Sequence, residues 1–263
     1  MRQLRAIMRA VALAALTLML YAVWGAGALF TLPFKRAFYV WRCFIFRSWA
    51  RATARLLGIW IEVQGVLPEP PFFLVSNHLS YIDIVVFASS LDCVFIAKRD
   101  VSRWPVLGSM CRSMGTIFID REKRRDVTRV NGLIEETLAS GRGVVLFAEG
   151  TSTEGAAVRE FKPALLEQAA AMRLPVSYAA LSYSTPAGET PAHLSVCWWG
   201  DMTFLDHLFA LLRLPEFRAT LIFGPRRVRE SDRKLLAVKL RQAVEEQFIP
   251  VVVLEEECSA KAH

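Results

Sequence analysis

The stretch Phe72–Asp83, FFLVSNHLSYID, carries the most informative pattern in the chain. It opens with large apolar residues, as a buried strand does. Ser-Asn-His comes next, which is a poor ending for a buried strand unless the end of that strand is used. The carboxylate of Asp83 stands five residues beyond His78, where a helical pattern begins. The stretch therefore predicts a strand, a loop that carries chemistry, and a helix.

Apolar runs and helical patterns alternate through the remainder of the chain. Strands are predicted at residues 61–66, 72–76, 93–98, 115–120, 143–149, 174–183, 194–200 and 219–224. Helices are predicted at residues 81–91, 126–139, 163–172 and 231–247. Strands separated by helices of this length indicate a mixed α/β fold, with a largely parallel central sheet flanked by helices.

The composition limits the classes of protein to consider. Hydrophobic residues make up 54% of the 263 residues, above the roughly 45 to 50% of soluble domains. The net charge of +7 suits either nucleic acid or an anionic membrane. The sequence contains no nucleic-acid-binding motif, so we favour the membrane as partner over nucleic acid. Its five scattered cysteines indicate a reducing compartment, with neither a disulfide framework nor a zinc site.

The N-terminal region predicts a membrane element. Residues 10–33 carry no charge, and such a run is long enough to cross a bilayer as a helix. The basic, amphipathic segment 38–60 follows, so we expect residues 1–60 to form a membrane-associated helical hairpin and residues 61–263 the α/β domain. A signal peptide cleaved near Ala26–Ala28 and a hairpin buried in the core are the alternatives. The flanking arginines favour a main domain on the cytoplasmic face.

Polar side chains gather where the predicted strands end, which is where open α/β sheets place their reactive groups. They are Asn77, His78 and Asp83 after the first buried strand, Asp120 and Arg121 after another, and Glu149, Gly150 and Thr151 after a third. A histidine at a strand end is commonly structural, as is each of the others taken singly. Their shared position at the strand ends favours a functional site.

The spacing of His78 and Asp83 suits an acid–base pair. A carboxylate in the first turn of the following helix can reach back to one imidazole nitrogen and leave the other as a base facing the cleft. No G-x-S-x-G motif supplies a nucleophile, and neither Cys93 nor Cys111 has a base beside it in the sequence. The pair therefore predicts activation of a substrate hydroxyl, and hence group transfer onto an alcohol.

Two further features favour a polar headgroup as ligand. Arg121 offers a guanidinium fork for phosphate at the edge of the sheet. Glu149-Gly150-Thr151 forms a tight turn whose backbone N–H groups and side chains can hold such a group. A solvated basic loop and an ordinary turn are the alternatives.

With these sites the chain resembles the lysophospholipid and glycerophosphate acyltransferase family. The resemblance rests on four blocks in order: Asn77, His78 and Asp83 as N-H-x4-D, then GTIFIDRE at 115–122, FAEGTST at 147–153 and FKPALLEQA at 161–169. It implies a glycerolphosphate acyltransferase-like fold, with His78 as general base oriented by Asp83. It also implies substrate binding by Asn77, Arg121, Glu149, Gly150, Thr151 and Lys162.

Three segments depart from the family's pattern. Ala148 and Ser152 replace a proline and an arginine that relatives often carry in the third block, and Ser177 stands where a second proline is usual in the late Pro-Val-x-Pro block. The segment 196–217 resembles lyso-ornithine lipid acyltransferases, and its aromatic residues suit an interfacial helix, an acyl-chain wall or half-buried core. These departures concern the identity of the acceptor.

The resemblance implies a membrane-bound O-acyltransferase of the bacterial inner membrane. It would move a fatty acyl group from acyl-CoA or acyl carrier protein to a lysophospholipid, foremost 1-acylglycerol 3-phosphate to give phosphatidic acid. No cofactor or metal is expected. A lyso-ornithine lipid is the alternative acceptor, and a non-catalytic lipid-binding membrane protein or an esterase are alternatives of another class.

Overall fold

The computed structural model describes residues 1–104, 107–120 and 124–252, and within them lies a seven-stranded sheet of order β1-β7-β6-β2-β5-β3-β4. The strands are β1 (Ile59–Gln64), β2 (Phe73–Ser76), β3 (Cys93–Lys98), β4 (Ile117–Ile119), β5 (Gly143–Phe147), β6 (Val176–Ser184) and β7 (Phe217–Phe223). From β6 to β4 neighbouring strands are parallel, whereas β7 runs antiparallel to β6 and β1 runs parallel to β7. The mixed, largely parallel sheet expected from the sequence is confirmed.

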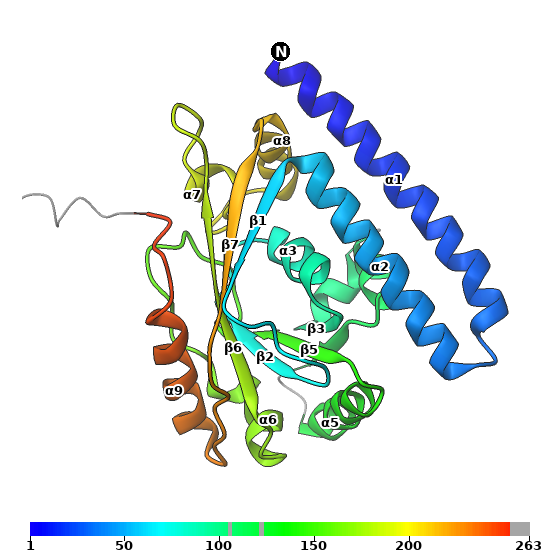
Figure 1. Cartoon of the computed structure of the whole chain (residues 1–263), viewed down its shortest axis with the longest axis vertical. Coiled ribbons are helices and arrows are strands. Elements are labelled where there is room, and N and C mark those ends of the chain that lie inside the picture. The colour runs from blue at the N-terminus through cyan, green and yellow to red at the C-terminus, as the bar shows by residue number, and fades with distance from the viewer. Residues whose placement is uncertain (105–106, 121–123, 253–263) are drawn as a thin grey trace, which may run out of the picture.

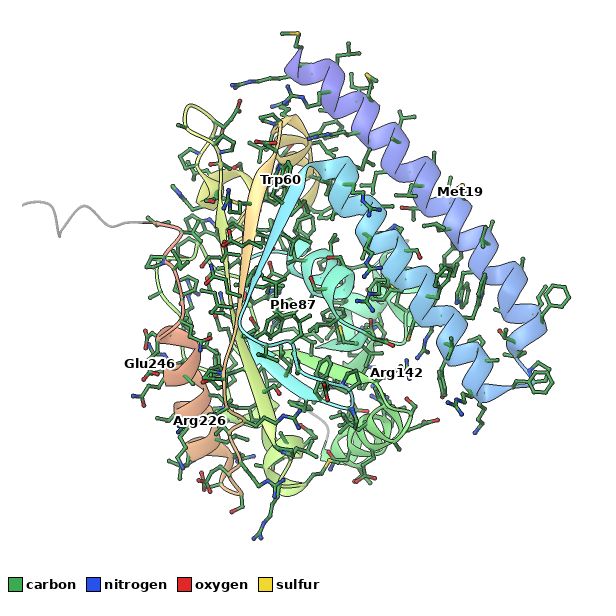
Figure 2. All side chains as sticks on the ribbon, in the orientation of Figure 1. Met19, Trp60, Phe87, Arg142, Arg226 and Glu246 are labelled. Atoms are coloured by element: carbon green, nitrogen blue, oxygen red, sulfur yellow. The ribbon has the colours of Figure 1, made fainter. Side chains whose placement is uncertain are left out.

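Helices cover both faces of this sheet (Figure 1). They are α1 (Arg2–Thr31), α2 (Lys35–Leu57), α3 (Ile82–Ser90), α4 (Leu107–Ser113), α5 (Arg124–Ala139), α6 (Glu167–Ala171), α7 (Ala192–Ser195), α8 (Phe204–Arg213) and α9 (Arg233–Glu245), with 3-10 turns η1 (Arg99–Arg103) and η2 (Pro163–Leu165). Side chains of α2, α3 and α8 form one core cluster, in which Phe87 lies between the hairpin and the sheet (Figure 2). Side chains of α5, α6 and α9 form a second cluster on the opposite face.

Strand β2 shows how the sequence divides between the two clusters. Successive side chains of a strand point to opposite faces of the sheet. Phe73 and Val75 accordingly belong to the cluster of α5, α6 and α9, and Leu74 belongs to that of α2 and α3. All three are 2% exposed or less. Burial on both faces explains the unbroken apolar run that predicted this strand.

Two predicted elements are wrong. Residues 194–200 form no strand: Ala192–Ser195 is the short helix α7, and a loop follows it. The indoles of Trp198 and Trp199 donate to the carbonyls of Met202 and His193, so the apolar run folds on itself locally. The helix predicted at 163–172 is two pieces, η2 and α6. The segment after the loop is a helix, α8, as one interpretation of its aromatic pattern held.

The first two helices run antiparallel side by side (Figure 1). Indole N–H groups of α2 join them, because Trp49 donates to the hydroxyl of Thr17 and Trp41 to the carbonyl of Trp24. By length and composition α1 is able to cross a membrane, and little of it is buried in the protein. Met19 points away from the domain (Figure 2).

The second helix belongs to the core of the main domain. Phe46, Ala50, Ala54 and Leu57 of α2 are buried in the cluster that also holds α3 and one face of the sheet. The helix ends at Gly58, whose φ of 73° is one that glycine adopts without strain. Strand β1 begins at the next residue. Helix α2 is therefore part of the layers of the domain, whereas α1 packs along their outer side.

Arginines tie the beginning of α1 to the domain. Arg9 donates to the carbonyls of Leu214 and Pro215 at the C-terminal end of α8, and Arg5 donates to the carbonyl of Arg213. These carbonyls have no partner within α8, and a cation there also offsets the negative end of the helix dipole. The arginines that precede the apolar run therefore fix α1 to α8.

We expect Arg9→Ala to loosen this contact. The loss of two hydrogen bonds from a charged donor should lower the free energy of local opening at the end of α8 by about 1 to 3 kcal/mol. Hydrogen exchange of residues 211–216 in detergent micelles measures this. Arg36→Ala, which alters an exposed arginine at the start of α2, is the control. Equal exchange in both variants would show that the Arg9 contact contributes nothing.

Candidate active site

His78 and Asp83 meet at the C-terminal end of β2. The strand ends at Ser76, and Asp83 lies in the first turn of α3. Nδ1 of His78 is 2.7 Å from Oδ2 of Asp83, and the two side chains are 22% and 0% exposed. Because the carboxylate only accepts, Nδ1 carries the proton and Nε2 is left as a base. The distance matches the reach that the spacing predicted.

The carboxylate of Asp83 receives other donors as well. Oδ2 accepts from the amide of Leu79 at 2.7 Å, and the amide of Ser80 lies 3.1 Å from both oxygens. Oδ1 accepts from the hydroxyl of Tyr183 at 2.7 Å. Several hydrogen bonds thus compensate a charge that is fully buried. The sequence analysis missed Tyr183, because no local pattern links it to a residue a hundred positions earlier.

The ring of Phe147 packs against one face of the His78 imidazole. Its ring stacks on that of His78 with centroids 4.3 Å apart and planes 11° apart. Phe147 is the last residue of β5 and pairs with Ser76, the last residue of β2 before the histidine loop. The stack and the bond to Asp83 together leave the imidazole little freedom to turn.

Asn77, which the sequence predicted to bind substrate, has its side chain bonded within the protein. Its side chain is 1% exposed. Its Nδ2 donates to the carbonyl of Leu181 and its Oδ1 accepts from the amide of Leu181. The amide group of Asn77 therefore takes the place of a strand neighbour beside β6, beyond the end of β2. These two bonds hold the start of the loop against β6.

Glu149 lies beside the loop, with its side chain turned inward. It is 2% exposed, and Oε1 accepts from the amide of His78 at 3.3 Å. Among the described residues Oε2 has no partner. The pKa of Glu149 is raised from 4.5 to about 8, mainly because the group is buried. The hydrogen bond from the His78 amide lowers the pKa, and the charge of Asp83 raises it. At neutral pH the group is therefore mostly a neutral acid.

The remaining predicted binding residues divide into two groups. Gly150, with φ of 74°, turns the chain after β5, and Thr151 beyond it is exposed. Lys162 is exposed, and its amide donates to the carbonyl of Ala148. Arg121 lies outside the described residues. The structure thus brings Gly150 and Thr151 to the end of β5, next to β2. Lys162 lies on a later segment, which is hydrogen-bonded to Ala148 just after β5.

Thr153 also contacts the histidine loop, by a bond to the backbone of His78 that was not predicted from the sequence. Its amide donates to the carbonyl of His78 at 3.0 Å, and it is 1% exposed. Glu149 holds the amide of the same residue. The third block thus bonds both backbone groups of His78.

Aromatic side chains line the other flank of the loop. The hydroxyl of Tyr81 is 3.1 Å from Nδ1 of His207, and its ring contacts those of Trp198 and Phe204. The amide of Trp198 donates to the carbonyl of Leu79, which joins this wall to the loop. His207 is 4% exposed. It belongs to this wall, and no carboxylate of the described residues bonds its ring as Asp83 bonds that of His78.

Comparison with known proteins assigns the family. The family model for acyltransferases matches residues 60–182, which contain the four blocks. The chain is 35% identical over 207 residues to a lyso-ornithine lipid O-acyltransferase of Brucella abortus, with 74% of this chain and 78% of that protein covered. The chain belongs to the acyltransferase family. A 1-acyl-sn-glycerol-3-phosphate acyltransferase of Neisseria meningitidis is another relative, 31% identical with 74% and 76% covered.

Other members extend this comparison. A lyso-ornithine lipid O-acyltransferase of Rhizobium meliloti is 33% identical, and the match spans 68% of this chain and 65% of that acyltransferase. The crystal structure of the 1-acyl-sn-glycerophosphate acyltransferase PlsC of Thermotoga maritima has a TM-score of 0.65, with 94% and 98% of the chains covered. At 18% identity it shows that the fold is shared. Within the described residues of this acyltransferase-family chain, no three His, Cys, Asp or Glu side chains cluster to hold a metal.

Glu149 should make folding stability fall as the pH rises. A carboxyl group whose pKa is raised in the folded state keeps its proton there while the unfolded chain releases it, so stability is lost between about pH 4.5 and 8. The expected loss is roughly 3 to 5 kcal/mol. Glu149→Gln mimics the neutral form and should remove this part of the pH dependence.

Melting temperatures of both proteins between pH 5 and 8 measure the effect. Glu160→Gln, at an exposed glutamate of the same connection, is the control and should keep the wild-type slope. A wild-type slope in Glu149→Gln would mean that Glu149 is ionised in the folded protein.

Proposed function

We propose that the chain is an O-acyltransferase that moves a fatty acyl group from a thioester to the free hydroxyl of a lysophospholipid. The buried bond between His78 and Asp83 is the observation that carries this proposal. Nε2 of His78 removes the hydroxyl proton while the oxygen attacks the thioester carbonyl. Asp83 stabilises the imidazolium, which then returns the proton to the departing thiolate. The acyl–sulfur bond breaks and an ester forms.

Two acceptors fit the family. We place 1-acylglycerol 3-phosphate first, giving phosphatidic acid, with Arg121, Glu149, Gly150, Thr151 and Lys162 as the residues that bind substrate. A relative that is named for this acceptor supports the choice. The names of two other relatives favour a lyso-ornithine lipid as the second candidate. Ser152, in place of the arginine common in relatives, removes one cation that would suit a phosphate.

A transferase differs from a lipid-binding scaffold in its catalytic pair, and from an esterase in the acceptor of the acyl group. A protein that only binds lipid does not need the His78–Asp83 bond, so the intact pair favours catalysis. An esterase would use water as acceptor, and exclusion of water belongs to the assembled site. A transferase should consume the thioester faster when a hydroxyl acceptor is added, and an esterase should not.

We expect His78→Ala to lower turnover by about two to four orders of magnitude, as loss of a general base does. The assay follows a labelled acyl thioester, supplied as acyl-CoA or acyl carrier protein, with either lysophosphatidic acid or lyso-ornithine lipid. His193→Ala is the control, because His193 is a partly exposed residue of α7 and is not part of the loop that carries the pair. Wild-type activity in His78→Ala would reject the assignment of the base.

The product identifies the acceptor. Labelled phosphatidic acid that depends on His78 supports the first candidate. Label on the aminolipid alone supports the second. Thioester loss that depends on His78 but ignores both acceptors indicates an esterase, and no loss indicates a scaffold.

The membrane is the expected environment of the site. The apolar helix α1, whose length and composition suit a membrane span, suggests membrane association. Exposed apolar side chains of α1 include Leu4, Ile7, Met8, Val11, Leu18, Met19, Val23, Leu29 and Phe30. Since α8 and α2 contact the other side of α1, we propose that this exposed face meets lipid, with the main domain on the cytoplasmic side, where both acyl donors occur.

Substitution of two exposed residues of α1 tests this attachment. Leu18→Glu with Met19→Glu places two charges on the proposed lipid face and should reduce flotation with anionic phospholipid vesicles at least severalfold. Leu235→Glu with Val238→Glu, on the exposed side of α9, is the matched control and should float as the wild type does. Equal flotation of both variants would place the attachment elsewhere.

A further inference from the structure

Among the described residues, Tyr183 is the side chain from outside the histidine loop that bonds the carboxylate of Asp83. The phenol donates to Oδ1 at 2.7 Å, and Oδ2 is the oxygen that meets His78. Tyr183 is 3% exposed and Asp83 is 0% exposed. The phenol is thus enclosed together with the carboxylate.

The sheet explains why Tyr183 arrives there. Strand β2 stops at Ser76, opposite Ala179, while its neighbour β6 continues to Ser184. The last residues of β6 therefore flank the histidine loop. The backbone of Leu181 bonds the side-chain amide of Asn77 at the start of the loop. Tyr183 follows two residues later on the same face of β6, and its hydroxyl bonds Asp83 at the end of the loop.

We propose that Tyr183 is a positioning residue for the proton transfer, which it serves by fixing the orientation of the Asp83 carboxylate. This proposal rests on the function assigned above to His78. With Oδ1 held by the phenol, the carboxylate cannot rotate away from Nδ1, so Nε2 keeps its direction toward the acceptor hydroxyl. No proton moves to or from Tyr183.

The electrostatics agree with this role. Burial raises the pKa of Tyr183 well above its ordinary value, as does the adjacent charge of Asp83. The phenol therefore stays protonated and acts only as a donor. Its ring also packs edge-on against Phe217, with centroids 6.0 Å apart. A test has to separate this packing from the hydroxyl, and Tyr183→Phe does so because it keeps the ring.

Tyr183→Phe should lower kcat by about 3- to 30-fold and leave KM for both substrates within about twofold. The full-length protein is assayed in vesicles with acyl-CoA and the acceptor that the wild type uses. Tyr178→Phe is the matched control, because Tyr178 lies on the same strand but in the opposite core cluster. It should retain wild-type kcat. An unchanged kcat in Tyr183→Phe overturns the proposal.

A double-variant comparison separates positioning from packing. If Tyr183 acts through Asp83, adding Tyr183→Phe to Asp83→Ala should cause no further loss of kcat. The same fold loss in both backgrounds would assign Tyr183 a structural role and overturn the proposal. Should Asp83→Ala fail to fold, as its circular dichroism would reveal, Asp83→Leu provides the second background.

A spectroscopic measurement keeps the proposal testable if the substrate assignment fails. In the protein labelled with ¹⁵N-histidine, the Nδ1–H signal of His78, assigned by its loss in His78→Ala, reports its bond to Asp83. We expect this signal to shift or broaden in Tyr183→Phe and to stay in place in Tyr178→Phe. An unchanged signal in Tyr183→Phe would overturn the proposal whatever the reaction proves to be.

Discussion

The buried charge of Asp83 is the constraint on which the arrangement of the site depends. A carboxylate with no exposed surface requires donors, and here they come from the imidazole, from the amides of Leu79 and Ser80, and from a phenol on β6. The N-terminal turn of α3 adds a favourable dipole. Satisfying this one group fixes the path of the chain between β2 and α3, and so the direction of His78.

The sheet order assembles these donors. Strand β2 lies between β6 and β5, so the histidine loop has a partner on each side. Strand β6 supplies the bonds to Asn77 and Asp83, while β5 supplies the ring under His78 and leads to the two residues that bond its backbone. The blocks spread along the sequence are therefore neighbours in space for a topological reason.

The sequence predicted the elements that follow local rules. Strands buried on both faces appear as unbroken apolar runs, and the spacing from His78 to Asp83 places them within reach of each other. The bonds of Tyr183 and Asn77 to their partners depend on which strands become neighbours, which no local pattern encodes. The run at 194–200 looked like a strand because its tryptophans are apolar, yet their indole N–H groups bond nearby carbonyls and close a loop. The predicted contact of Arg121 lies outside the described residues.

The place of α2 within the core has a practical consequence for handling the protein. A membrane anchor joined by a linker can be deleted to leave a soluble catalytic fragment. Here deletion of the hairpin would strip Phe46, Ala50 and Leu57 from the side of the sheet that also holds α3, and would expose a surface of the core. A water-soluble form has to be sought by replacing exposed apolar side chains of α1 with polar ones, while both helices are kept.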